Sequence, residues 1–120
     1  MSDYHEPTNE LTNETRDYTR ALNSLKEEIE AVDWYQQRVD ATSDEQLKKV
    51  LAHNRDEEIE HACMALEWLR RNMEGWDENL KTYLFTTKDI TEIEEEEETT
   101  GEKKETDDNS SNDIRIGKIK

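Results

Sequence analysis

The chain has few of the residues that cross-link or interrupt small folds. Its 120 residues include one cysteine, one proline and three glycines, and 31% of them are apolar. Because a single cysteine, Cys63, forms no internal disulfide, we expect a reducing compartment. No apolar run approaches the roughly 18 residues of a membrane-spanning helix. The first ten residues also lack the basic and apolar regions of a secretory signal. We therefore expect a cytoplasmic protein without membrane association.

Basic residues are scarce relative to acidic ones. Sixteen Lys and Arg stand against 32 Asp and Glu, which gives a net charge of −16. With an isoelectric point near 4.5, the chain is not expected to bind nucleic acid, because phosphates attract basic patches. The same charge is compatible with binding cations. Gly-rich phosphate loops and the GxSxG nucleophile motif are missing too, which removes two further enzyme classes.

The acidic excess divides the chain into a domain and a tail. Residues 1–88 carry a net charge of −9, whereas the shorter stretch after them carries −7 and includes five consecutive glutamates. Residues 89–112 are predicted to be a disordered acidic linker, because they bury too little apolar surface to offset the entropy of ordering. Residues 1–9 are predicted to be a flexible N-terminus. Residues 10–88 form the folded domain, which is small enough that oligomerisation or a metal is expected to stabilise it.

Two long helices are predicted, over about residues 10–39 and 44–73. The turn between them contains Asp, Ala, Thr and Ser, and two pairs there have capping-box spacing: Thr42 with Glu45, and Ser43 with Gln46. Gly75 is suited to end the second helix, and the apolar spacing after it predicts a short third helix. The predicted fold class is all-α, with an antiparallel two-helix hairpin and a short third helix.

The apolar pattern of the first helix is typical of a coiled coil. Its seam consists of Leu11, Tyr18, Leu22, Leu25, Ile29, Val32, Gln36 and Val39. The second helix has one ordinary apolar stripe and a second stripe that is apolar at its ends but polar at its centre. Glu58 and His61 occupy that centre.

Glu58 and His61 form a Glu-x-x-His motif, whose side chains are neighbours on one helix face. Alone, such a motif is most often an ordinary solvated face. The hairpin favours a second interpretation, because Glu28 and Glu58 lie equally far along the chain from the turn and should face each other. One chain then supplies one Glu and one Glu-x-x-His, which is half of the ligand set of four-helix di-iron carboxylate proteins.

A second copy of the chain would complete this set. Two-fold dimers are the commonest oligomers, so we expect two hairpins to dimerise into a ferritin-like four-helix bundle. Carboxylate oxygens with one imidazole per metal suit non-haem iron better than zinc. The predicted ligands are Glu28, Glu58 and His61, with two irons per dimer interface.

Other residues near this motif have two interpretations each. Glu27 and Glu30 share one side of the first helix with Trp34, where they form either an acidic approach that concentrates Fe²⁺ or ordinary surface charge. Tyr35 lies seven residues from Glu28 on the same face. It either hydrogen-bonds a ligating carboxylate or simply packs in the hairpin.

Several long strings resemble one family, the encapsulated ferritins, which are cargo proteins of encapsulin nanocompartments. The strings are residues 28–40, residues 51–61, residues 66–71 and residues 82–85, so the resemblance covers about residues 5–88. The terminal stretch 113–120 alternates apolar and basic residues and resembles the peptides that dock such cargo to the shell. Its matching positions are Ile114, Ile116, Gly117 and Ile119.

The resemblance implies an activity and an assembly. It implies a ferroxidase that oxidises Fe²⁺ to Fe³⁺ at Glu28, Glu58 and His61 of two subunits and passes iron to the encapsulin shell for storage. It places Trp34 and Tyr35 near the centre and a peripheral site, where metal enters, at Glu27 and Glu30. It also implies a ring of dimers, typically a decamer, inside the nanocompartment. The alternatives are a non-catalytic iron carrier and a coiled-coil adaptor cargo protein.

Overall fold

A computed structural model shows the fold and describes residues 4–107. Its elements are a 3₁₀ turn η1 (Thr8–Glu10) and the helices α1 (Asn13–Ala41), α2 (Glu45–Asn72), α3 (Trp76–Tyr83) and α4 (Ile90–Asp107). No strand occurs in this part of the chain, so the predicted all-α fold is confirmed. Within the same residues, no helix combines the length and the apolar character needed to cross a membrane. The chain divides into two compact units, Met1–Leu69 and Arg70–Lys120.

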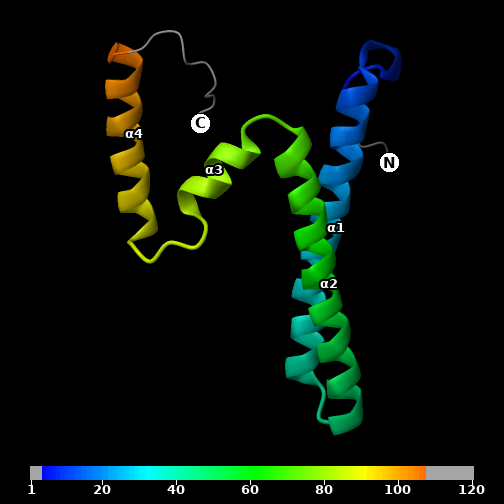
Figure 1. Cartoon of the computed structure of the whole chain (residues 1–120). Helices are drawn as coiled ribbons and strands as arrows, with labels where there is room; N and C mark the ends of the chain where they lie inside the picture. Colours follow the sequence, from blue (N-terminus) through cyan, green and yellow to red (C-terminus); the bar gives the residue numbers. More distant parts are fainter. Residues whose placement is uncertain (1–3, 108–120) are drawn as a thin grey trace. The chain divides into compact units, whose positions relative to one another are not determined.

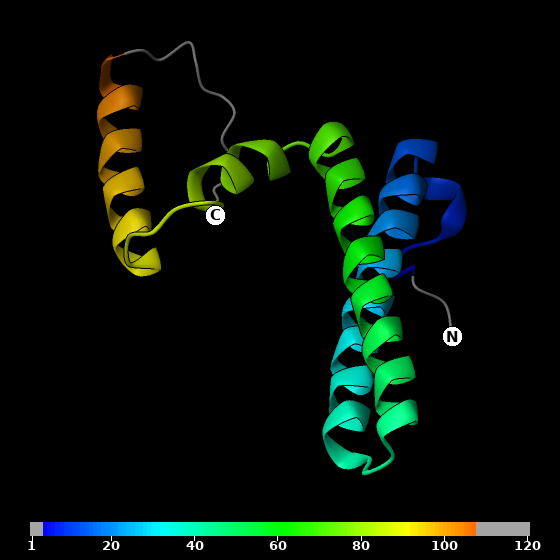
Figure 2. The same cartoon turned by 60° about the horizontal axis from the view of Figure 1, so that its bottom comes forward.

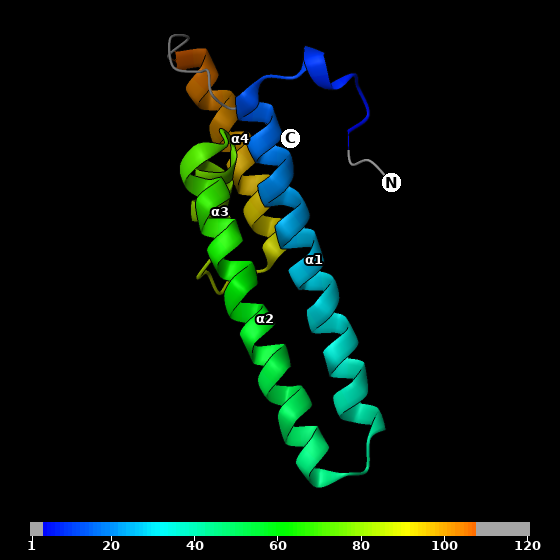
Figure 3. The same cartoon turned by 90° about the vertical axis from the view of Figure 1, so that its right-hand side faces the viewer.

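In the first unit, α1 and α2 form the predicted antiparallel hairpin. The two helices run side by side in each of three views (Figures 1, 2 and 3). The first helix begins at Asn13 rather than at residue 10, because Thr12 caps it: the Thr12 hydroxyl accepts a hydrogen bond from the Thr15 N–H at 3.0 Å. Before it, η1 occupies the end of the segment 1–9 that is predicted to be flexible.

The start of α2 differs from the predicted capping boxes. The cap is Asp44, whose carboxylate accepts a hydrogen bond from the Leu47 N–H at 2.8 Å. Thr42 supports this cap from behind, since its hydroxyl accepts the Asp44 N–H at 3.2 Å. An acidic cap also suits the positive end of the helix dipole. The turn itself is where the sequence predicts it.

The predicted seam of α1 divides between two faces. Tyr18, Leu25 and Val32 are half-buried, whereas Leu22 and Ile29 are 36% and 56% exposed. The seam therefore stays a prediction: within one chain the half-buried face includes Glu28, and Leu22 and Ile29 lie outside it. Further exposed apolar side chains on the hairpin are Trp34, Leu47, Val50, Ile59, Met64 and Trp68.

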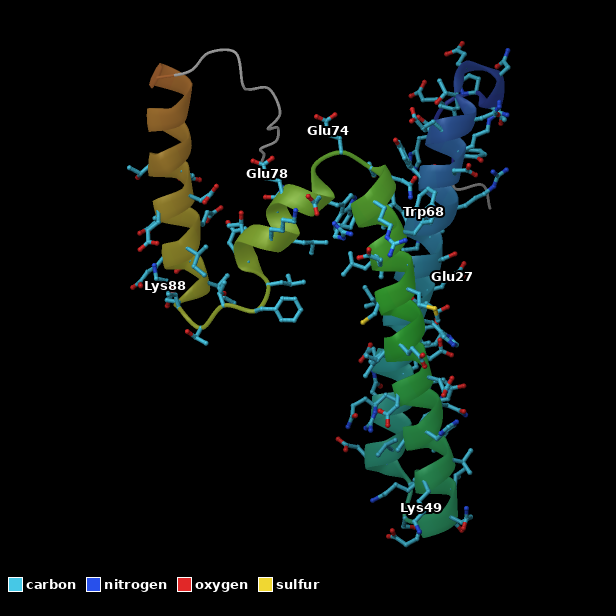
Figure 4. All side chains as sticks on the ribbon, in the orientation of Figure 1. Glu27, Lys49, Trp68, Glu74, Glu78 and Lys88 are labelled. Carbon is cyan, nitrogen blue, oxygen red and sulfur yellow. The ribbon has the colours of Figure 1, made fainter. Side chains whose placement is uncertain are left out.

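Little of the hairpin is buried within one chain. Among the residues described, the buried hydrophobic side chains are Leu69 and Ile93, and the first unit contains only Leu69. Near the open end of the hairpin, Tyr18 and Trp68 pack edge to face with ring centroids 6.5 Å apart, and Figure 4 shows Trp68 against α1. A core this thin indicates that the hairpin needs further packing for stability.

The second unit begins with the end of α2 and the short helix α3. Gly75 precedes α3 with φ +102°, a backbone conformation that L side chains adopt only with strain. Its carbonyl accepts a hydrogen bond from the Asn79 side chain at 2.8 Å. Asp77 pairs with both Arg70 and Lys81, and these cations hold the pKa of the Asp77 carboxyl below its ordinary value. The predicted short helix is confirmed.

Helix α4 lies where the sequence predicts a disordered linker. Asp89 caps it, because its carboxylate accepts hydrogen bonds from the N–H groups of Thr91 and Glu92 at 2.9 and 3.1 Å. Ile93 is buried, and Lys88 pairs with Glu96 at 2.9 Å. Glutamate is a good helix former. The prediction of a disordered linker rests on net charge and does not include this helix propensity. The rest of the linker and the peptide 113–120 lie outside the described residues.

The cap of α2 gives a test in which two neighbouring residues should behave differently. We expect Asp44→Ala to destabilise the chain by about 1 kcal/mol, because it leaves the Leu47 N–H without its partner. Thermal unfolding at fixed protein concentration should show a melting temperature lowered by several degrees. Ser43→Ala is the matched control and should melt like the wild type. A loss in Ser43→Ala that is absent from Asp44→Ala would favour the capping box over Asp44.

Candidate metal centre

Glu28 of α1 and Glu58 and His61 of α2 come together in the middle of the hairpin. One donor atom from each lies within 4.8 Å of the others, and all three side chains are partly buried. Helix geometry aligns Glu58 with His61, and the antiparallel pairing brings Glu28 opposite them. In the part of the chain that the structure describes, no other group of three or more histidine, cysteine or acidic side chains is this close. Their role as metal ligands remains a prediction.

The imidazole of His61 has a defined orientation in this group. Its Nδ1 lies 3.6 Å from a carboxylate oxygen of Glu28 and 3.6 Å from one of Glu58. Its Nε2 faces the other way and lies 3.8 Å from an oxygen of Glu57. The second oxygen of Glu57 lies 3.8 Å from Nε2 of His53. The ring therefore presents one nitrogen to the two carboxylates and the other to Glu57.

The proximity of two carboxyl groups changes the protonation of Glu28. The pKa of Glu28 is raised above its ordinary value, first because hydrogen bonding to Glu58 favours the protonated form. Partial burial and the negative charge of Glu58 raise the pKa further, and His61 offsets part of the rise. Two adjacent carboxylates thus carry an electrostatic penalty that a bound cation would remove.

The donor set suits a divalent transition metal. Two ligand atoms that share one ion, each at about 2.1 Å, can lie no more than about 4.2 Å apart. The 3.6 Å separations around Nδ1 fall inside this limit. Carboxylate oxygens and one imidazole, without a thiolate, are acceptable to iron. Three donors leave part of an ion's coordination shell open, so one hairpin provides an incomplete site.

The remaining predicted residues are not joined to this group. Glu27 and Glu30 are exposed, and Figure 4 shows Glu27 at the outer side of the hairpin. Trp34 is 49% exposed. Tyr35 is half-buried, and the guanidinium carbon of Arg38 lies over its ring, 5.1 Å from the ring centroid. The proposed parts of these residues in metal uptake and in support of the ligands remain predictions.

Two contacts beside the centre were not predicted from the sequence. Glu57 contacts His61, and the spacing of four residues between them was the available signal. One turn before Glu58, Arg55 donates a hydrogen bond to the side-chain oxygen of Gln36 at 2.7 Å, which links α2 to α1. That link helps to fix the register in which Glu28 opposes Glu58.

Comparisons with known proteins agree with this fold. Residues 3–87 match a family model described as EncFtn-like. The ferritin-like protein of Thermotoga maritima is 73% identical over 92 residues, which cover 77% of this chain and 81% of that protein. The encapsulated ferritin-like protein of Rhodospirillum rubrum is 61% identical over 90 residues, which cover 75% of this chain and 64% of that protein, less than two thirds of its length. The crystal structure of protein ne0167 from Nitrosomonas europaea has 61% sequence identity and a TM-score of 0.72, over 74% of this chain and 98% of that chain.

The raised pKa of Glu28 predicts how the metal-free protein responds to Glu28→Gln. A carboxyl whose pKa is raised on folding stabilises the fold below its unfolded pKa, and this contribution is lost as the pH rises through the folded pKa. At neutral pH the charged pair is therefore unfavourable. We expect Glu28→Gln to melt at or above the temperature of the wild type in the presence of a chelator, while losing metal-induced stabilisation. A melting temperature several degrees lower without metal would contradict this.

Proposed function

This chain belongs to the EncFtn-like family, as its resemblance to the encapsulated ferritins predicts, and on that premise we propose that it is a ferroxidase. It oxidises Fe²⁺ to Fe³⁺ with O₂ at a two-iron site formed between two copies of the chain. The observation that carries the proposal is the group of Glu28, Glu58 and His61, whose donor atoms lie within 4.8 Å of one another.

The ligands of two chains balance the charge of the substrate. Each chain contributes the carboxylates of Glu28 and Glu58, so a pair of chains offers four negative charges to two Fe²⁺ ions. Each Fe²⁺ gives up one electron, so two Fe²⁺ reduce one O₂ by two electrons, and with two protons from water the O₂ becomes hydrogen peroxide. Anionic oxygen ligands favour the more highly charged Fe³⁺ product. His61 supplies the single nitrogen ligand to each iron, from its Nδ1 atom.

The exposed apolar side chains of the hairpin support assembly around this site. Leu22, Ile29 and Ile59 are between 36% and 56% exposed in one chain, a state that burial against a second hairpin would remedy. The resulting dimer would be the ferritin-like four-helix bundle expected from the sequence. Dimers then associate into a ring, typically of ten chains, and Glu27 and Glu30 form the peripheral site at which iron enters.

Delivery to a shell rests on the family and on the end of the chain. The Rhodospirillum rubrum relative is named an encapsulated ferritin-like protein. We propose that residues 113–120 dock this chain to an encapsulin shell through Ile114, Ile116, Gly117 and Ile119, and that the Fe³⁺ is stored in the shell. The protein would then work in the cytoplasm, inside the nanocompartment.

The proposed activity is tested by adding Fe²⁺ aerobically to the metal-free protein and following Fe³⁺ absorbance together with O₂ consumption. Rapid oxidation is expected in the wild type. Background rates and loss of stoichiometric iron binding are expected in Glu28→Ala, Glu58→Ala and His61→Ala, because each removes a ligand. Helix content should stay unchanged in all three variants.

Glu74→Ala is the matched control for this experiment, because Glu74 is exposed and lies outside the hairpin (Figure 4). It should oxidise iron like the wild type. Iron binding without oxidation in the wild type would replace the ferroxidase with an iron carrier. Wild-type iron binding in all three ligand variants would leave only an adaptor role.

Deletion of residues 113–120 tests the shell partner separately. Iron oxidation should be unchanged, because the deleted residues contain none of the proposed ligands. Loading into co-expressed encapsulin should fall to background, as measured by co-purification with assembled shells. Unchanged loading would show that the peptide does not target the chain.

A further inference from the structure

The imidazole of His61 can bind a metal through either ring nitrogen, and the two choices place the ion differently. Nδ1 lies 3.6 Å from oxygens of both Glu28 and Glu58, so an ion shared by all three residues must bind at Nδ1. Nε2 must then carry the ring proton. Rotation of the ring by half a turn about the Cβ–Cγ bond would put the Cδ2 carbon in the place of Nδ1 and remove the nitrogen ligand from the site.

Glu57 is the group that the Nε2 atom faces. Its carboxylate oxygen lies 3.8 Å from Nε2, one helical turn before His61 on the same helix. Metal-bound histidines usually donate their other N–H to a carboxylate, a backbone carbonyl or water, which fixes the ring orientation and the tautomer. We propose that Glu57 is a positioning residue that holds His61 with Nδ1 toward Glu28 and Glu58. This role rests on the proposed function.

A second histidine, His53, lies near Glu57. The other carboxylate oxygen of Glu57 lies 3.8 Å from Nε2 of His53, one further turn toward the start of α2. The spacing of four residues places His53, Glu57 and His61 along one helix face. The carboxylate therefore lies between two imidazoles, with one of them 3.8 Å from each oxygen.

Glu57 acts through His61 rather than as a ligand of the same ion. It is absent from the group formed by Glu28, Glu58 and His61, and it lies near Nε2 of the imidazole, whereas Glu58 lies near Nδ1. Its side chain is 47% exposed, compared with 25% for Glu58. A general attraction of cations by its charge would not depend on this geometry, so the two effects can be separated.

Anaerobic titration of the full-length, metal-free protein with Co²⁺ provides the first test, because the visible absorbance of Co²⁺ reports its ligands. We expect Glu57→Ala to weaken Co²⁺ binding by about 10- to 100-fold. Glu57→Gln retains an oxygen that accepts the Nε2 proton and should bind almost as well as the wild type. Asp56→Asn is the matched control. It removes the same charge from the neighbouring residue, whose side chain contacts Arg55 rather than His61.

The second measurement reads the ring directly. Solid-state ¹⁵N NMR of Zn²⁺-loaded, ¹⁵N-histidine-labelled protein distinguishes metal-bound from protonated nitrogens, and His61→Gln identifies the His61 signals by their loss. We expect Nδ1 to carry the metal and Nε2 the proton in the wild type. In Glu57→Ala, signals from His61 that binds the metal through Nε2, or from unbound His61, should appear.

Three results would overturn the role of Glu57. These are Zn²⁺ on Nε2 in the wild type, Co²⁺ affinity of Glu57→Ala equal to the wild type, or equal weakening in Glu57→Gln and Asp56→Asn, which indicates charge alone. In each case binding by the wild type leaves the ferroxidase proposal intact. A wild type that binds neither Co²⁺ nor Fe²⁺ would overturn that proposal and this role together.

Discussion

The close approach of two carboxyl groups, Glu28 and Glu58, is the constraint on which the rest of the structure depends. Their proximity raises the pKa of Glu28, which shows that the folded hairpin holds negative charge where it is unfavourable. Two carboxyl groups stay this close only when the surrounding structure keeps them there. In this hairpin the register of the two long helices does so. The Asp44 cap sets where α2 starts, and the bond from Arg55 to Gln36 crosses between the helices. The penalty suits a site that binds cations, because a bound positive charge removes it without moving either helix.

The same hairpin is incomplete as a folded unit. Its single fully buried hydrophobic residue, Leu69, cannot offset the conformational entropy of ordering two helices of 29 and 28 residues. The apolar side chains that would complete a core, such as Ile29 and Met64, are more than half exposed. They share the two helices with the three proposed metal ligands. A second hairpin would satisfy both deficits at once, which is why assembly and metal binding are expected to depend on each other.

The sequence predicts the hairpin and the three clustered residues because both follow from local periodicity. Glu58 and His61 are adjacent by helical spacing, and Glu28 follows once the position of the turn is known. Two features do not follow from that reasoning, for identifiable reasons. Asp44 competes with Thr42 and Ser43 for the cap, and only geometry decides among neighbouring oxygen acceptors. Net charge alone does not predict helix α4, because the helix propensity of glutamate and the cap at Asp89 favour a helix there.

Metal and partner act on stability through the same linkage. A cation that binds the folded pair of chains, and not the unfolded chain, stabilises the pair in proportion to the logarithm of its concentration. Because ionised Glu28 and Glu58 repel each other without a cation, part of the free energy of cation binding would relieve that repulsion, and the remainder would be available to hold two hairpins together. Ligand orientation then controls more than affinity. A His61 ring turned away from the site would weaken metal binding, and weaker metal binding would in turn weaken the association of the chains. The positioning of one imidazole by Glu57 is therefore expected to influence assembly as well as iron binding.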